Sequence, residues 1–360
     1  MAGPAFDRFE IRAATPDHHA ELLDLARHLN TVNLPDDPDA LSALLESSER
    51  SFSGEIEDPA RREYVFLLYD RVADRAVGTS MIIGQLGRRD APYIYFDVRR
   101  EEKYSATLDR HFVHTILHTT YSYDGPTELG GLVMHPDYRK RPERLGRLIS
   151  YVRFLFIAMR RRDFRNELLA ELLPPLRPDG TSDLWEAVGR RFTGLSYQHA
   201  DKLSRRNKEF IRGLFPTAIY ATLLDPEAQA LVGQVGPQTR GVAKMLARIG
   251  FRYAERVDPF DGGPHFVAPT DDVSLVAAAA PVALTTLAGE AEMLPGSQPW
   301  MLARAYETRP YFVALCAPAL RDSGGLQVLA EHAALRPQGS GALLWGVALP
   351  GPATGSSPPG

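Results

Sequence analysis

Residues 127–164, TELGGLVMHPDYRKRPERLGRLISYVRFLFIAMRRRDF, contain the pattern that decides the fold. The apolar start predicts a buried strand that ends in a turn, and the periodic apolar residues after the turn predict a long amphipathic helix. Basic residues surround Gly146 where this helix begins, namely Arg139, Lys140, Arg141, Arg144 and Arg147. A helix start presents unpaired N–H groups and the positive end of the macrodipole, so the segment predicts an anion cradle. A solvated basic turn explains the same residues equally well.

Strands and helices alternate on both sides of this segment, which predicts an α/β or α+β fold on a mixed sheet. Upstream, RFEIRAAT predicts a strand, two helical segments follow, and EYVFLLYD with RAVGTSMIIGQL predicts a hairpin. Downstream, NELLAELLPPL predicts a strand that two prolines end. Residues 91–124 predict an inserted strand followed by a helix, TLDRHFVHTILHTTY. His111, His114 and His118 would share one face of that helix, which we interpret as structural because no HExxH-like signature accompanies them.

Composition excludes several classes of function. The formal net charge of −4 and a hydrophobic content of 44% are typical of a soluble globular protein and predict no nucleic-acid partner. No apolar run approaches the length of a membrane span, and the N-terminus lacks signal-peptide features. The single cysteine, Cys316, excludes an intramolecular disulfide and a Cys-rich metal site. We therefore expect a cytoplasmic protein without a membrane partner, a metal or a permanently bound cofactor.

Several short motifs occur in one order along the chain. They include YVFLLYD, TELGGLVMHPDYRK, SDLWEAVGRRFT, GQV and PQT around Gly236, and FDGGP from Phe260 to Pro264. In this set and order they resemble the arginine N-succinyltransferase family over roughly residues 9–270. The resemblance implies a GNAT-like fold, possibly with two lobes, and transfer of a succinyl group from succinyl-CoA to the α-amino group of arginine. It also implies self-association or pairing with a related subunit.

We expect the chain to divide into four parts. The resemblance implies the first two, and a change to an Ala-, Pro- and Gly-rich composition after about residue 268 indicates the last two. Residues 8–195 would form a GNAT-like acyl-CoA-binding lobe and residues 196–268 a second lobe with the family's catalytic loop. Residues 269–350 would form a small β-module, and residues 351–360 a disordered tail. For the cofactor side, the family's acyl-CoA contact falls on Leu132, and Gly146, Arg144 and Arg147 would hold the CoA phosphates.

The position of the family's catalytic histidine is occupied by Gly236, which has no side chain to move a proton. Three interpretations remain open. The chain is an acyltransferase with a replacement group, it uses another donor or acceptor, or it is an inactive CoA-binding or partner subunit. The candidate replacement is His265, which follows FDGGP where the family has threonine.

Acidic residues are the candidates for contact with arginine, because a guanidinium favours bidentate carboxylate partners. Asp258, Asp261 and Glu128 match acidic positions of the family, and Gln234 lies in the catalytic loop. Each carboxylate also has an ordinary structural explanation, as a turn cap or an acid at the edge of the core.

Overall fold

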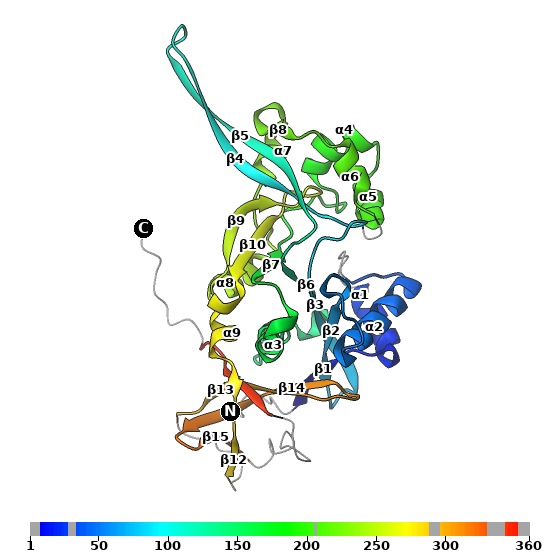
Figure 1. Cartoon of the computed structure of the whole chain (residues 1–360), viewed down its shortest axis with the longest axis vertical. Helices are drawn as coiled ribbons and strands as arrows, with labels where there is room; N and C mark the ends of the chain where they lie inside the picture. The colour runs from blue at the N-terminus through cyan, green and yellow to red at the C-terminus, as the bar shows by residue number, and fades with distance from the viewer. Residues whose placement is uncertain (1–7, 28–33, 205–206, 288–295, 330–342, 352–360) are drawn as a thin grey trace.

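The computed structural model describes the chain except for residues 1–7, 28–33, 205–206, 288–295, 330–342 and 352–360. Its strands form one continuous mixed sheet in the order β11-β16-β13-β14-β1-β2-β3-β6-β7-β10-β9-β4-β5-β8 (Figure 1), with β12 and β15 at the side. The strands are β1 (Phe9–Ala13), β2 (Glu63–Asp70), β3 (Arg75–Ile83), β4 (Tyr93–Ser105), β5 (Arg110–Ser122), β6 (Thr127–Met134), β7 (Glu167–Glu171), β8 (Ala218–Tyr220), β9 (Arg252–Val257), β10 (Pro264–Pro269), β11 (Ala280–Pro281), β12 (Leu284–Leu287), β13 (Gln298–Ala305), β14 (Phe312–Asp322), β15 (Gly325–Leu329) and β16 (Trp345–Ala348). The predicted mixed α/β class is confirmed.

Helices cover both faces of the central strands. The α-helices are α1 (His19–Ala26), α2 (Pro38–Ser53), α3 (Leu145–Met159), α4 (Arg190–Thr193), α5 (Tyr197–Ser204), α6 (Glu209–Leu214), α7 (Pro226–Leu231), α8 (Arg240–Ala247) and α9 (Ser274–Ala278), and a π-helix spans Trp185–Gly189. Val65 and Leu67 of β2 pack with α1 and α2, whereas Phe66 and Leu68 pack with α3. This alternation is the period-2 pattern of a strand buried on both faces. No helix in the described part of the chain is long and apolar enough to cross a membrane.

The predicted helix TLDRHFVHTILHTTY is wrong, because β5 occupies this segment. β5 pairs with β4 residue by residue from Tyr93–Ser122 to Ser105–Arg110, so the backbone groups of this segment bond to a neighbouring strand. The β-branched and aromatic residues of the segment also favour a strand. Successive side chains of a strand point to opposite faces. His114 and His118 therefore share a face that His111 does not, and the three histidines do not line up as predicted.

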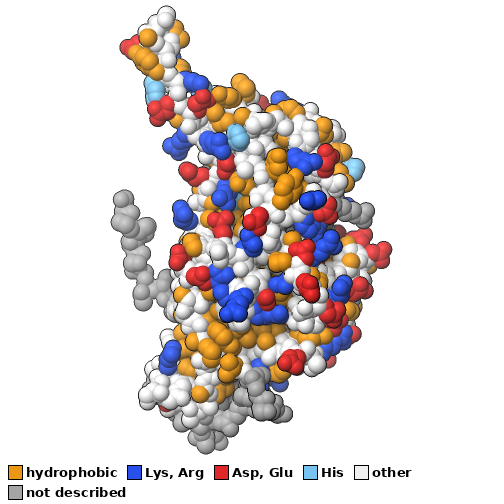
Figure 2. All heavy atoms as spheres, in the orientation of Figure 1, with side chains coloured by type: hydrophobic (Ala, Val, Ile, Leu, Met, Phe, Trp, Pro, Cys, Tyr) orange, Lys and Arg blue, Asp and Glu red, His pale blue; other side chains and the backbone are white. Residues whose placement is uncertain are grey.

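β4 and β5 extend beyond the body of the molecule as a two-stranded ribbon, which we call the arm, residues 99–115 (Figure 1). Its neighbours β9 and β8 pair only with its base, at Phe96–Asp97 and at Ile116–His118. Large hydrophobic side chains are exposed toward its tip, including Tyr104, Leu108 and Phe112. Figure 2 shows basic and acidic side chains interspersed along the visible face and hydrophobic atoms at this tip.

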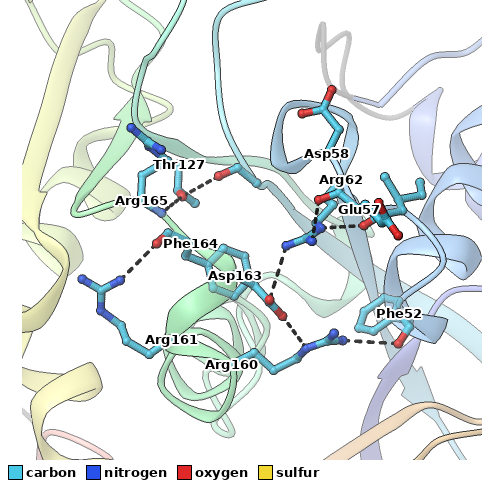
Figure 3. A network of polar contacts seen from close by, with 12 residues as sticks. Phe52, Glu57, Asp58, Arg62, Thr127, Arg160, Arg161, Asp163, Phe164 and Arg165 are labelled. Atoms are coloured by element: carbon cyan, nitrogen blue, oxygen red, sulfur yellow. Dashed lines mark hydrogen bonds and ion pairs between the residues drawn. The ribbon is translucent and has the colours of Figure 1, made fainter.

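The end of α3 is tied to its surroundings by arginines, which places β7 beside β6. Arg160 donates to Asp163 (2.7 Å) and to the carbonyl of Phe52 at the end of α2, and Arg62 also reaches Asp163 (Figure 3). The backbone N–H of Arg165 donates to Thr127 Oγ1 at the start of β6 (3.0 Å). The basic run RRRDFR, residues 160–165, therefore holds the end of α3 in place.

The C-terminal strands continue the sheet through the pairing of β14 with β1. Strands β14 and β16 lie within residues 269–350, for which the sequence predicts a small β-module. The boundaries predicted at residues 195 and 268 stay a prediction. Strands from both sides of each boundary belong to the same hydrogen-bonded sheet. The predicted disordered tail lies outside the described residues apart from Gly351.

Candidate functional site: a strand wedge beside a buried acid and histidine cluster

The parallel neighbours β6 and β7 separate in the middle of the sheet. The two strands pair at only two positions of the described chain, Thr127 with Leu168 and Glu128 with Leu169. Beyond them β6 continues along β3, whereas β7 continues along β10. Such a divergence leaves backbone donors and acceptors of both strands without a ladder partner, and these groups are the kind that hold an extended amide-bearing ligand.

A β-bulge lies in the diverging part of β6. Thr79 pairs with Val133 and Met81 with Gly130, so Ser80 alone faces Gly131 and Leu132. Gly131 has a φ of 57°, and a Cβ there would lie 2.8 Å from Met81 Cγ, so both backbone and space require glycine. A bulge leaves its extra residue out of the ladder. Leu132, the predicted acyl-CoA contact, thus lies where a backbone group is free to meet a ligand.

The predicted anion cradle lies at the N-terminus of α3. Arg144 is the N-cap residue with a left-handed backbone (φ 53°), and the helix begins at Leu145, so Gly146 is its second residue. Arg147 is half-buried, its Nε has no hydrogen-bond partner among the described residues, and burial lowers its pKa. The positive charge of Arg248, after α8, also acts on Arg147. An anion bound here would relieve this repulsion between cations.

The basic turn before α3 is only partly available for an anion. Arg141 forms a two-pronged ion pair with the buried carboxylate of Glu143, at 3.1 and 3.2 Å. Arg139 donates to the carbonyl of Met134. The structure therefore separates the cradle residues Arg144, Gly146 and Arg147 from these two turn arginines, which have structural partners.

A second cluster forms where β7 ends. His265 on β10 pairs in register with Glu171, the last residue of β7. The Nε2 atom of His265 lies 3.4 Å from Glu171 Oε1, and its Nδ1 lies 2.9 Å from the hydroxyl of Tyr93. Ligand atoms of Glu171, Asp258 and His265 all lie within 4.8 Å of one another. His265 is fully buried, whereas about a third of the Glu171 side chain is exposed.

The turn between β9 and β10 fixes the carboxylates of this cluster. Asp258 accepts hydrogen bonds from the backbone N–H groups of Phe260 (2.7 Å) and Asp261 (3.2 Å), and Asp261 accepts one from Gly263 (2.7 Å). A carboxylate held by backbone donors keeps one orientation. The FDGGP motif therefore builds a rigid acidic turn next to Glu171.

The electrostatics of the cluster are set by burial. The surrounding protein raises the pKa of Glu171 above its usual range by partial burial, although about a third of the side chain stays exposed, and the charges of Glu128 and Asp258 raise the pKa further. Burial also raises the pKa of Asp258 and Asp261. Burial lowers the pKa of His265 to about 3, so its imidazole is neutral at pH 7.

The loop around Gly236 packs against the β9–β10 turn and the segment that follows β7. Gly233 N–H donates to the Gly262 carbonyl, and Gly236 N–H and Thr239 Oγ1 both donate to the Leu173 carbonyl. A Cβ at Gly236 would lie 2.5 Å from the carbonyl oxygen of Pro174. The backbone after β7 thus occupies the space into which a histidine at this position would begin. Gln234, the predicted substrate contact in the loop, is exposed.

The structure brings most predicted residues into two places. Leu132 and the cradle residues lie on β6 and at the start of α3, and Glu128, Asp258, Asp261 and His265 all face or influence Glu171. The sequence analysis missed Glu171, Tyr93 and Arg248. The strand order β7-β10-β9-β4 brings Glu171 and Tyr93 to His265, and the packing of the chain after α8 brings Arg248 near Arg147. One signal was present: Glu171 ends a buried strand just before two prolines.

Two other features do not join the site. A cavity of about 420 Å³ lies around Asp183, Glu186, Asp225 and Glu227, and none of the predicted site residues lines it. Cys316 is buried, and burial raises the pKa of its thiol to about 12, so it is no nucleophile.

A mixed sheet with two parting parallel strands, a helix N-terminus after the first and a cluster of carboxyl groups at the end of the second is the arrangement of an acyl-transferring enzyme. Residues 9–275 match the family model described as arginine N-succinyltransferase beta subunit. The chain belongs to the arginine N-succinyltransferase family.

Individual relatives agree with this assignment. The arginine N-succinyltransferase of Yersinia pestis is 35% identical over 261 residues, which cover 71% of this chain and 73% of the relative. The subunit beta of the Pseudomonas aeruginosa enzyme is 34% identical over 74% of this chain and 78% of its own length. The structure of the arginine/ornithine succinyltransferase subunit AI from Pseudomonas aeruginosa superimposes with a TM-score of 0.78 at 26% identity, covering 95% of this chain and 98% of that chain.

Proposed function

We propose that this chain catalyses transfer of a succinyl group from succinyl-CoA to the α-amino group of arginine, in arginine catabolism. The observation that carries the proposal is the match to arginine N-succinyltransferases over residues 9–275, together with a shared fold over nearly the whole chain. The reaction needs a neutral amine, a polarised thioester carbonyl and a protonated leaving thiol.

The donor would lie in the wedge between β6 and β7. The bulged backbone at Leu132 would hold the thioester carbonyl, and an oxyanion contact of this kind typically contributes about 10²–10³-fold to the rate. Gly146 would offer its N–H to the CoA phosphates, with Arg144 and Arg147 as the accompanying positive charges. The divergence of the two strands and the partnerless Nε of Arg147 support this placement.

The acceptor would lie at the end of β7. Asp258, Asp261 and Glu128 supply the negative charge that a guanidinium or ammonium group requires, and Gln234 lies exposed on the adjoining loop. Their proximity to Glu171 supports a cation site there, because buried carboxylates of like charge are stabilised by a positive ligand.

The relatives named as beta subunits suggest that the chain works in an assembly. We propose a homo-oligomer or a complex with a related subunit, in the cytoplasm. The division into an acyl-CoA-binding lobe, a catalytic-loop lobe and a β-module is part of the same proposal.

The test is release of free thiol. Purified protein is mixed with succinyl-CoA and arginine, and the thiol is followed with a chromogenic disulfide. Turnover that requires both substrates supports the proposal. Gly236 supports a second candidate, a CoA-binding partner subunit without catalysis. Tight CoA binding with no thiol release across a panel of amines would favour that candidate.

A further inference from the structure

We propose that Glu171 is the general base that takes the proton from the acceptor ammonium group, with His265 and Tyr93 behind it as positioning residues. The inference rests on the proposed function and names the proton acceptor of that site. It assigns the work to a residue that the family's histidine position does not indicate.

Solvent exposure distinguishes Glu171 from His265 as a candidate base. A base must reach the proton that it removes, and His265 is fully enclosed, whereas about a third of the Glu171 side chain is exposed. Glu171 ends β7, on the strand whose parting from β6 opens the wedge. It therefore lies between the buried histidine and the space proposed for the substrates.

His265 has an unused ring nitrogen that is directed at Glu171. Nε2 is enclosed and has no hydrogen-bond partner among the described residues, and Glu171 Oε1 lies 3.4 Å away. A partnerless buried polar atom costs free energy, so the pair gains when a small movement closes this gap. Catalytic hydrogen bonds are often long before substrate binds.

The chain Tyr93–His265–Glu171 serves both states of the carboxyl group while the ring stays neutral. With Glu171 ionised, the Tyr93 hydroxyl donates to Nδ1, and Nε2–H donates to the carboxylate. With Glu171 protonated on its other oxygen, Oε2, the Nε2–H group still donates to Oε1, so the ring keeps one neutral tautomer. No imidazolium forms, which agrees with a buried ring whose pKa is lowered to about 3.

Other charged groups around Glu171 set the pH at which it works. These groups are Glu128 on β6, Asp258 and Asp261 in the β9–β10 turn, Lys208 just before α6 and Arg256 on β9. Burial and the acidic neighbours raise the pKa of Glu171 well above its usual range, and Lys208 acts against them. A carboxyl group with a raised pKa is a stronger base, suited to an ammonium proton.

The step balances as follows. The Glu171 carboxylate takes one proton from R–NH3⁺, and the freed lone pair attacks the thioester carbonyl carbon to form the C–N bond. The C–S bond then breaks, and the departing thiolate takes the second proton from nitrogen as the amide forms. Glu171 returns its proton to water, so one amide, one CoA thiol and one H⁺ result.

The experiment measures kcat for thiol release against pH in wild type, Glu171→Gln and Glu171→Asp. Loss of the base should lower kcat by ~10²–10⁴-fold and remove the ascending limb of the pH profile. The aspartate variant should keep part of the rate on a displaced limb, because it keeps a carboxylate. CoA affinity of all three proteins should agree, since Glu171 is not part of the phosphate cradle.

Positioning by His265 and Tyr93 has its own readout. His265→Thr and Tyr93→Phe remove the donors that stabilise the Glu171 carboxylate, so the ascending limb should move to higher pH. A purely structural role would lower the amplitude and leave the limb in place. Glu102→Gln, on the arm, is the control and should follow wild type, because Glu102 lies on the distant ribbon.

Several outcomes would overturn the assignment. Turnover by wild type with unchanged kcat in Glu171→Gln removes Glu171 from the mechanism but leaves the proposed function intact. Absence of turnover in wild type, with CoA bound, instead defeats the proposed function. If a chelator abolishes activity and Zn²⁺ restores it, Glu171, Asp258 and His265 act as metal ligands, and the proton-acceptor role fails.

Discussion

Two histidine–glutamate pairs have the same separation and opposite surroundings. His265 Nε2 lies 3.4 Å from Glu171 between β10 and β7, and His111 Nε2 lies 3.4 Å from Glu102 on the arm. His265 is fully buried, whereas the arm pair is 52% and 74% exposed. Water screens the exposed pair, so its interaction is worth at most about 1 kcal/mol. The two separations are equal, so the pairs differ in their surroundings, and burial is what lowers the pKa of His265.

The pH dependence of stability should show the largest contrast. The folded-state pKa of His265 is lowered from 6.5 to about 3, so its contribution is complete above pH 6.5 and is lost as the pH falls toward 3. The loss is on the order of 5 kcal/mol. Glu171 acts oppositely: its raised pKa favours folding at low pH, and this contribution is lost as the pH rises above about 4.5.

Urea unfolding of wild type, His265→Thr and His111→Ala at several pH values measures this contrast. The stability curve of His265→Thr should fall less steeply below pH 6.5 than that of wild type. His111→Ala is the exposed control on the arm and should leave the stability close to that of wild type. Parallel stability curves for wild type and His265→Thr would show that the lowered pKa of His265 does not contribute to the acid sensitivity of the fold.

Deletion of each imidazole at pH 7.5 gives the next effect. His265→Ala empties a fully enclosed site beside Tyr93, and the loss of packing should lower the free energy of unfolding by about 2–3 kcal/mol. His111→Ala should change it by less than about 0.5 kcal/mol. Equal effects in denaturant titrations would mean that the arm is as tightly packed as the sheet.

Two glycines extend the contrast to the loop. A Cβ at Gly236 meets backbone at 2.5 Å, whereas nothing lies within 4 Å of a Cβ at Gly241 in α8. Gly236→Ala should therefore lower stability by about 2 kcal/mol through overpacking. Gly241→Ala should raise it by up to about 1 kcal/mol through helix propensity. Thermal unfolding of both variants gives the measurement, and a stable Gly236→Ala protein would contradict the crowding.

The smallest effect concerns two arginines. Arg147→Ala should weaken CoA binding by about 10-fold, or about 1.4 kcal/mol, because its half-buried guanidinium sits at the start of α3. Arg99 on the arm pairs with Asp97 at 3.0 Å, and Arg99→Ala should leave CoA affinity unchanged. Calorimetric titration with CoA decides this. Equal affinities of the two variants would remove the α3 N-terminus from the CoA site.

Local patterns in the sequence were enough to predict part of this molecule. The strand and helix at 127–159 follow from apolar runs and period, and the motif order predicts the family. The arm could not be predicted, since TLDRHFVHTILHTTY satisfies a helical spacing and only pairing with β4 selects the strand. Glu171 could not be found either, because its proton affinity depends on Asp258 and His265, which a sheet pairing brings from far along the chain.

The crowding at Gly236 also bears on how this chain can change. The carbonyls of Leu173 and Pro174 fill the place that the first side-chain carbon of a larger residue would take. A substitution of Gly236 by histidine would meet this backbone, so the segment after β7 would have to move to accept it. The path of the chain after β7 therefore limits which side chains position 236 can hold.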